Sequence, residues 1–369
     1  MGTLGFIVVD YPPMLGGIAR YTGDIVRFLA PLVAWRVYLR VTTPPAPWPD
    51  HPHHGCIDPQ ELHDHPERVA ARLQTDGVTH VLFNHIDLAG PRTVRAFRTR
   101  GIPCSVFLYG ADINFHRSPR GHARLYATAA LMRHRIVISE GTRRLVHRRL
   151  PLLGTQMITP GIEEGAPDVP GLGNRHGIIA VGRLVRRKGF DTLLEAAARL
   201  RREGLDVPVT FAGDGPDRDW LIQRAAELGL GAQVAIRSGL TDEQIRAELR
   251  RHRVFCLLPR QLGNGDVEGF GIVFLEAARE GLPVVAGRSG GVPDAVDHEG
   301  NGFLVDPAGP GEAADRLRIL LTDDATWRRQ SERGLAWYRT FAWSRRDARR
   351  EFAFLLDSPT TPPPHGRTP

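Results

Sequence analysis

Short apolar runs alternate with amphipathic stretches in two successive halves of this chain, and this alternation constrains the fold more than any other feature. The runs are rich in β-branched residues without strict apolar–polar alternation, which is typical of strands buried on both faces of a parallel sheet. In the first half they cover residues 4–10, 35–41, 80–85, 103–109 and 135–139. In the second half they cover residues 177–183, 208–213, 233–238, 253–259, 282–287 and 302–305. Strand and helix repeated in this way predict an α/β fold with two facing, doubly wound domains.

The clearest predicted helix covers residues 190–203 and ends before a glycine. Apolar side chains at helical spacing form one stripe along it, which predicts a face packed against a sheet. The stripe consists of Leu193, Leu194, Ala197 and Leu200.

The length of the chain, 369 residues, is too great for one ordinary core and suits two α/β domains. A Pro- and Gly-rich stretch without periodicity predicts the boundary near 160–175, so we expect domains at 1–165 and 166–340. The last residues, 358–369, cannot bury a core and are predicted to be disordered. Ligands of doubly wound sheets bind at the carboxyl ends of the strands, which makes the cleft between the domains the default active site.

Composition indicates a globular protein of a reducing compartment. Hydrophobic residues make up 42% of the chain, and no apolar run approaches the ~20 residues that span a bilayer. Residues 1–10 read as a first strand rather than a secretory signal. The three cysteines are scattered and odd in number, which predicts neither a disulfide framework nor a zinc site. We therefore expect a cytoplasmic protein.

The net charge of +7 attracts anions but does not identify them. The chain contains a single lysine, Lys188, among many arginines. Arg183 ends a predicted strand, and Lys188 precedes a predicted helix by one glycine. Cations between a strand end and a helix N-terminus favour phosphate, because the helix dipole and free amides add to their charge. A solvated basic loop is the alternative, since Arg186 and Arg187 adjoin the lysine.

Two glutamates in the second half of the chain are further candidate site residues. Glu268 lies in a Gly-rich turn, and Glu276 lies eight residues further, inside the next predicted helix. Each carboxylate can accept two hydrogen bonds from neighbouring sugar hydroxyls. A general acid/base pair is a competing interpretation, and a solvated surface helix is the structural alternative.

The turn itself is suited to close approach by a ligand. Gly269 and Gly271 leave its backbone uncovered. The amides of Phe270, Gly271 and Ile272 open the helix and can donate to an anion.

Together these motifs resemble the family 4 retaining glycosyltransferases, which have the two-domain, Rossmann-like GT-B architecture. The resemblance covers most of the chain, and the glutamate, seven residues, glutamate pattern is its most specific part. Its blocks are GGIARYTGDIV (16–26), VGRLVRRKGFDTLLEAAARL (181–200), FAGDGPDRDWL (211–221), EGFGIVFLEAA (268–278) and GGVPDAVDHEGNGFLVDP (290–307).

The resemblance implies a donor site in the 166–340 domain. Arg183 and Lys188 would clamp the donor diphosphate, Glu268 would lie by the donor sugar and Glu276 would bind the ribose hydroxyls. The resemblance makes Arg183, Lys188 and Glu268 the expected catalytic residues.

It also implies roles for backbone groups and for the other domain. The amides of Phe270 and Gly271 would contact the sugar or phosphate, and a loop with Gly16 and Gly17 would close on the donor. Residues 1–165 would take the acceptor, and residues 341–357 would form a helix that crosses back to this domain.

The implied reaction moves a hexosyl or N-acetylhexosaminyl group, with retention and without a metal or cofactor, from a nucleoside diphosphate to an acceptor hydroxyl. Family members use uridine, guanosine and adenosine donors, of which a uridine donor is expected here. The acceptor, a small molecule, glycan or lipid, is not identified. Two alternatives remain, a nucleotide-sugar epimerase and a catalytically silent partner protein that binds nucleotide sugar.

One position departs from the family pattern. Many members carry a histidine before Gly-x-Asp in the first domain, where this chain has Tyr109 before Gly110 and Asp112. Tyrosine stays neutral near pH 7, so this change is expected to alter the preferred sugar or how it is held. The alternative is that Tyr109 closes the first-domain core.

Three other features of the sequence are weaker evidence for a function. The histidines of HPHH (51–54) lack ligand spacing and favour an irregular loop over a metal site. The basic stretch 132–150 could contact a membrane or an anionic acceptor, although a solvated helix face is the favoured interpretation. Aromatic residues do not interleave the arginines, so no nucleic-acid partner is expected.

Overall fold

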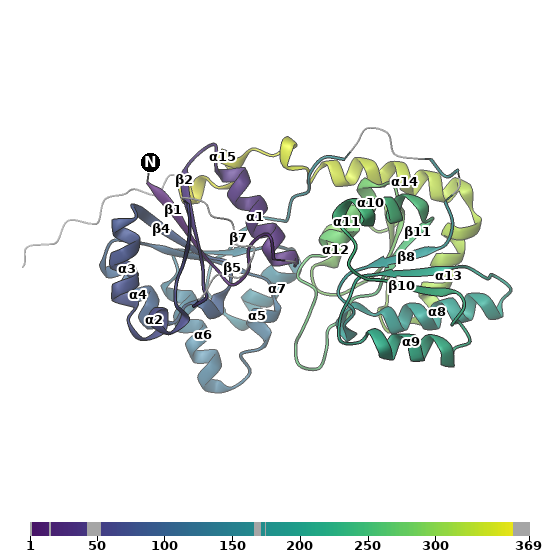
Figure 1. Ribbon diagram of the computed structural model, residues 1–369, viewed down its shortest axis with the longest axis horizontal. Coiled ribbons are helices and arrows are strands. Elements are labelled where there is room, and N and C mark those ends of the chain that lie inside the picture. Colours follow the sequence, from purple (N-terminus) through teal and green to yellow (C-terminus); the bar gives the residue numbers. More distant parts are fainter. Residues whose placement is uncertain (1, 15, 43–52, 166–170, 174, 357–369) are drawn as a thin grey trace, which may run out of the picture. The chain divides into compact units, whose positions relative to one another are not determined.

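The computed structural model describes residues 2–14, 16–42, 53–165, 171–173 and 175–356. The chain divides into two compact units, each with its own parallel sheet (Figure 1). Unit 1 comprises residues 1–138, 142–158 and 346–369, and unit 2 comprises residues 139–141 and 159–345. The chain therefore passes from unit 1 to unit 2 after residue 158, shortly before the division predicted at 165, and returns to unit 1 at residue 346.

Unit 1 contains a sheet in the order β3-β2-β1-β4-β5-β6-β7, parallel throughout. Its strands are β1 (Thr3–Val8), β2 (Ala34–Leu39), β3 (His54–Cys56), β4 (Val78–Phe83), β5 (Cys104–Leu108), β6 (His134–Val137) and β7 (Gln156–Met157). Its helices are α1 (Gly17–Leu29), α2 (Pro59–Asp64), α3 (Pro66–Thr75), η1 (Ile86–Leu88), α4 (Pro91–Thr99), α5 (Ala111–Asn114), α6 (Pro119–Leu131) and α7 (Glu140–Arg149).

The strand order fixes which helices share a face of this sheet. Helix α1 connects β1 to β2, whereas α3 and α4 lead into β4 and β5 on the other side of β1. Because both kinds of crossover are right-handed, α1 lies on the face of the sheet opposite α3 and α4 (Figure 1). The helices α2, α3, α4 and α6 pack in succession on their face. Buried side chains such as Phe83, Phe97 and Val106 fill the space beneath them.

Unit 2 contains a parallel sheet in the order β10-β9-β8-β11-β12-β13, which is the doubly wound order that reverses beside its first strand. Its strands are β8 (Ile178–Val181), β9 (Val209–Ala212), β10 (Val234–Arg237), β11 (Val254–Leu257), β12 (Val284–Gly287) and β13 (Gly302–Val305). Its helices are η2 (Arg186–Lys188), α8 (Phe190–Arg202), α9 (Arg218–Glu227), α10 (Asp242–Arg251), α11 (Ile272–Arg279), α12 (Val292–Ala295), α13 (Pro310–Thr322), α14 (Asp324–Arg339) and η3 (Trp343–Arg345).

In unit 2, α8, α9 and α13 lie on one side of the sheet, and α10, α11 and α12 lie on the other (Figure 1). The predicted stripe of α8 is confirmed, because Leu193, Leu194, Ala197 and Leu200 are all buried. The order of strands reverses between β8 and β11, and the crevice at their carboxyl ends is where such sheets bind ligands.

Every predicted strand is present, and the two doubly wound folds are confirmed. The structure adds β3 and β7, whose three and two residues are too few to produce a recognisable apolar run. His54, predicted to lie in an irregular loop, begins β3. No helix in the described part of the chain has the length and apolarity needed to cross a membrane.

The single helix predicted for 341–357 is wrong. The segment consists of η3, then α15 (Ala348–Glu351) and α16 (Ala353–Leu356). The amide of Trp343 donates to the carbonyl of Ile162 rather than to a helical neighbour, and the side chain of Asp347 caps α15. These two bonds interrupt the helix, and residues 346–356 belong to unit 1. The predicted disordered tail, 358–369, lies outside the described residues.

Candidate functional site

The turn between β8 and α8 brings the predicted cations to the carboxyl edge of unit 2. Arg183 follows β8, and Lys188 ends η2. Gly189 then enters α8 with a positive φ of 70°, and a Cβ there would lie 2.0 Å from the carbonyl oxygen of Leu258. Only glycine fits, because the neighbouring segment after β11 touches the backbone at this point.

We expect Gly189→Ala to destabilise the protein by about 3 kcal/mol, since it adds a backbone clash to the cost of a left-handed alanine. Gly204→Ala is the matched control: its φ is +85°, but no atom lies within 4 Å of the added Cβ. The control should lose only about 1 kcal/mol. Urea unfolding of both variants measures the difference, and equal losses would contradict the close-contact explanation.

The Gly-rich segment between β11 and α11 brings Glu268 to the same edge. A Cβ at Gly290 would lie 2.1 Å from the carbonyl oxygen of Glu268, and one at Gly291 would lie 2.0 Å from that of Gly269. The amide of Gly291 donates to the Glu268 carbonyl at 3.0 Å. The paired glycines after β12 thus fix the backbone that carries Glu268, a role that sequence reasoning did not assign to them.

Glu268 lies at the centre of an ion cluster. Its Oε2 accepts from Nζ of Lys188 at 2.7 Å and also from Nη1 of Arg187. The Nε of Arg187 lies 3.1 Å from Oδ1 of Asp266. The side chains of Lys188 and Glu268 are each only 12% exposed, so water screens this cluster little.

The cluster holds Glu268 ionised. Burial alone would raise the pKa of Glu268, but the charges of Lys188 and Arg187 outweigh it and lower the pKa to about 2. Burial would likewise lower the pKa of Arg187, but Glu268 and Asp266 outweigh it and raise that pKa. Two cations and two carboxylates therefore balance one another in the cluster.

Positive charge remains available for a ligand at the edge of the β8–β11 crevice. Arg183 is exposed and has no hydrogen bond or ion pair among the described residues. Lys188 has three N–H groups, and one of them reaches Glu268. The N-terminus of α11 has no acidic residue in its first turn, and its N-cap, Gly271, supplies no side-chain acceptor. Arg183, Lys188 and these amides together form an arrangement that can bind a diphosphate.

The remaining predicted donor residues lie on the same segment. Gly269 and Ile272 are partly exposed, as is Glu276 in the second turn of α11. The ring of Phe270 is buried, with its centroid 5.8 Å from that of Phe341, so only its amide can serve a ligand. Gly271 has a φ of 92°, and its Cβ would meet the ring of Phe274 at 2.7 Å.

Gly16, Gly17 and Tyr109 belong to unit 1. Gly16 is the N-cap of α1 and Gly17 its first residue, and both are exposed. Tyr109 is only 8% exposed, and its ring packs against those of Tyr21 and Phe107. Burial raises its pKa well above the usual range, so the hydroxyl stays neutral.

This placement favours the core interpretation of Tyr109. Asp112 follows it in the sequence, and its Oδ1 accepts from the amides of Tyr109 and Gly110 at 3.0 and 2.7 Å. The motif therefore fixes the turn after β5, whatever its effect on sugar preference.

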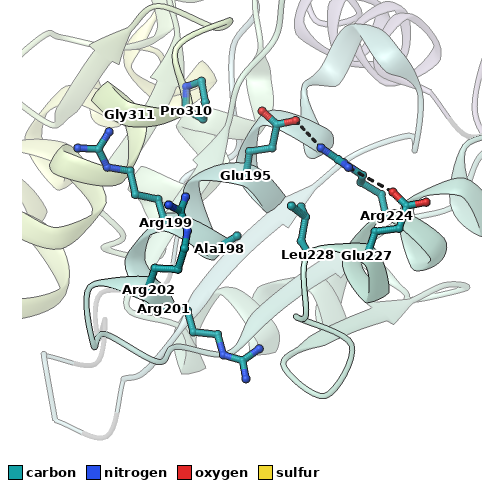
Figure 2. A pocket seen from close by; sticks show the side chains of 10 residues that line it. All are labelled: Glu195, Ala198, Arg199, Arg201, Arg202, Arg224, Glu227, Leu228, Pro310 and Gly311. Carbon is teal, nitrogen blue, oxygen red and sulfur yellow. Dashed lines mark hydrogen bonds and ion pairs between the residues drawn. The ribbon is translucent and has the colours of Figure 1, made fainter.

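Unit 2 also has a hollow away from the β8–β11 crevice. Its volume is about 900 Å³, and its lining residues belong mainly to α8, α9 and the start of α13. Figure 2 shows these side chains. Arg224 bridges Glu195 and Glu227 across it, and Arg199 pairs with Glu203. Carboxylates of the same two helices thus neutralise Arg199 and Arg224, whereas Arg201 donates, within the described part of the chain, only to the carbonyl of Gly229.

Sequence reasoning missed the role of Arg187, which it named only in the alternative of a solvated basic loop. The solvated-loop interpretation does not hold for Arg187, because its side chain is only 19% exposed and is bound to Glu268. Of the basic residues noted in α7, Arg149 donates to the carbonyl of His116 at 2.7 Å, whereas Arg144, His147 and Arg148 are exposed. The histidine stretch 51–54 lies partly outside the described residues.

Two doubly wound parallel-sheet units define the GT-B class of fold. Solved structures agree: sucrose-phosphate synthase from Thermosynechococcus elongatus has a TM-score of 0.77 at 20% identity, covering 97% of this chain and 98% of that one. HepE from Anabaena, in complex with UDP-glucose, has a TM-score of 0.75 at 20% identity, covering 97% and 100%. At these identities the likeness concerns the fold.

Residues 168–337 match the family described as Glycosyl transferases group 1. This part of the chain belongs to that family, and the predicted family resemblance is confirmed.

The matching relatives include mannosyltransferases. A GDP-mannose-dependent alpha-(1-6)-phosphatidylinositol monomannoside mannosyltransferase of Mycobacterium tuberculosis is 39% identical over 153 residues, which is 41% of this chain and 40% of that protein. The protein of the same name from Mycolicibacterium smegmatis is 36% identical over 198 residues, 50% of this chain and 51% of that protein. The chain thus covers about half or less of the length of these relatives.

Proposed function

We propose that this protein is a glycosyltransferase that moves a sugar from a nucleoside diphosphate to an acceptor hydroxyl, with retention of configuration and without a metal ion. The cation arrangement at the β8–β11 crevice carries the proposal, because Arg183 and Lys188 lie where a doubly wound sheet binds phosphate. The family match of residues 168–337 supports the same assignment.

In the proposed reaction, the bond between the sugar C1 and the diphosphate oxygen breaks, and the electron pair leaves with the diphosphate. The acceptor oxygen forms the new bond to C1, and its proton passes to a phosphate oxygen. Arg183, Lys188 and the amides at the start of α11 stabilise the charge that develops on the leaving group. This supply of positive charge is the basis for proposing that no divalent metal is needed.

Glu268 has a positioning role in this scheme. Its bonds to Lys188 and Arg187 hold the lysine at the mouth of the crevice and keep the carboxylate ionised beside the sugar. Glu276, one turn into α11, is proposed to bind the ribose hydroxyls.

For the donor we propose GDP-mannose rather than the uridine donor expected from sequence. The support is the activity named for the mycobacterial relatives, which are GDP-mannose-dependent mannosyltransferases. The acceptor is proposed to bind unit 1, and the exposed cations of α7 remain a candidate for contact with an anionic surface.

Thermal unfolding with GDP, UDP, ADP and their sugar conjugates, in EDTA, tests the donor. Ligand at a hundred times its Kd stabilises a fold by ~2.7 kcal/mol, which is a shift of about 2–4 °C for a chain of this size. We expect the largest shift with GDP and GDP-mannose. A larger shift with UDP would overturn the choice of base, and no shift with any of them would overturn the donor site.

The alternatives make different products. An epimerase would convert the nucleotide sugar without any acceptor, and chromatography would show a new nucleotide sugar with no free nucleoside diphosphate. A silent binding partner would show the thermal shift but release no nucleoside diphosphate with any acceptor.

A further inference from the structure

Unit 1 has a hollow of about 220 Å³ at the carboxyl edge of its sheet. Arg40, which follows β2, lines it together with Arg92 at the start of α4 and Arg124 of α6. His63 and Asp87 also line it. The volume is below the range of drug-sized ligand pockets, so it suits a small group rather than a whole nucleotide.

The positive charge of this hollow is not balanced from within. Arg40 and Arg124 have no side-chain hydrogen bond or ion pair among the described residues, and the Nε of Arg40 is buried without a partner there. Arg92 has only a long, exposed ion pair of 3.8 Å with Glu67. The one carboxylate of the lining, Asp87, is engaged by Nε2 of His116 at 2.8 Å.

The N-terminus of α4 adds to this charge. The helix has nine residues, no acidic residue in its first turn, and a glycine N-cap, Gly90, without a side-chain acceptor. A Cβ at Gly90 would lie 3.5 Å from Nη2 of Arg124, so this guanidinium lies beside the positive end of the helix dipole. Two positive groups in contact repel each other unless an anion binds between them.

We infer that this hollow binds the phosphate group of the acceptor, either a soluble polyol phosphate or the headgroup of a phospholipid. The inference rests on the proposed function, because it assigns a substrate class to the acceptor side of the same reaction. The planar guanidinium groups of Arg40 and Arg124 bind phosphate oxygens in pairs, and the amides of the first turn of α4 add further donors.

Binding of glycerol 3-phosphate to the full chain, measured by calorimetry with glycerol as the uncharged control, tests the inference. Arg124→Gln should weaken binding about tenfold, the loss of one charge-assisted contact, and Arg40→Gln with Arg124→Gln should abolish it. Arg95→Gln is the matched control, since Arg95 is exposed on the same helix but does not line the hollow. Circular dichroism checks that each variant is folded.

Arg183→Gln separates this hollow from the donor site of unit 2. Binding that persists in Arg183→Gln but is weakened about tenfold in Arg124→Gln supports the inference, even if no sugar transfer is ever detected. Absence of binding to the unaltered chain, or binding lost only in Arg183→Gln, would overturn it.

Sedimentation with phosphatidylinositol vesicles, compared with phosphatidylcholine vesicles, distinguishes the two sources of the phosphate group. Sedimentation that depends on Arg124 indicates a lipid headgroup, and binding of glycerol 3-phosphate alone indicates a soluble acceptor.

Discussion

Replacing Lys188 with alanine is expected to slow sugar release from the donor about 10²–10³-fold, the usual cost of removing one group that stabilises a leaving charge. Lys188 donates to Glu268 through one N–H and keeps the others for the diphosphate. Arg187 cannot replace it, because Glu268 and Asp266 already hold its guanidinium. The rate of nucleoside diphosphate release from GDP-mannose, with and without acceptor, measures the effect.

Arg186→Ala is the matched control. Arg186 belongs to the same turn η2, but its guanidinium stacks over the ring of Trp220 and is 45% exposed. This variant should keep its rate within about threefold of the unaltered protein, an effect of about 0.6 kcal/mol. Lys188→Arg should recover part of the rate, although a planar fork does not reproduce a compact ammonium. Equal rates for Lys188→Ala and Arg186→Ala would remove Lys188 from the proposed mechanism.

Glu268→Gln is expected to lower the free energy of unfolding by about 3 kcal/mol near pH 7. The pKa of this carboxyl falls from 4.5 to about 2 in the folded state, and each unit corresponds to ~1.4 kcal/mol. Its side chain is 12% exposed, so solvent screening reduces this figure little.

The same shift predicts how the loss depends on pH. Because the folded pKa is depressed, the ionised carboxylate stabilises the fold fully above pH 4.5, and this contribution disappears as the pH falls towards about 2. The stabilities of the unaltered protein and of Glu268→Gln should therefore converge between those values. Urea unfolding from pH 3 to pH 7 measures both curves.

Glu332→Gln provides the control for this measurement. Glu332 is exposed on α14 and has no hydrogen bond or ion pair among the described residues, so its variant should parallel the unaltered protein at every pH. A constant gap between Glu268→Gln and the unaltered protein across the whole range would show that Glu268 acts through packing rather than charge.

The pattern of apolar residues predicts the helices and strands because each of them depends on residues that are neighbours in the chain. An apolar run or a stripe at helical spacing depends on neighbouring residues, as the buried face of α8 illustrates. The same reasoning locates Arg183 at a strand end and Glu268 in a glycine turn, since these positions are defined by the elements that flank them. It fails for β3, β7 and the segment 341–357, where short pieces are fixed by bonds to distant backbone.

The sequence by itself determined the two doubly wound folds, the family resemblance and the loops that carry the charged side chains. Only the tertiary structure decided that Arg187 and Lys188 share one oxygen of Glu268, 80 residues away from the lysine. It also decided that Tyr109 is buried and that Arg40 and Arg124 line one hollow. The physical reason is that periodicity is a property of neighbours in the chain, whereas these contacts depend on which strands lie side by side and where their carboxyl ends meet.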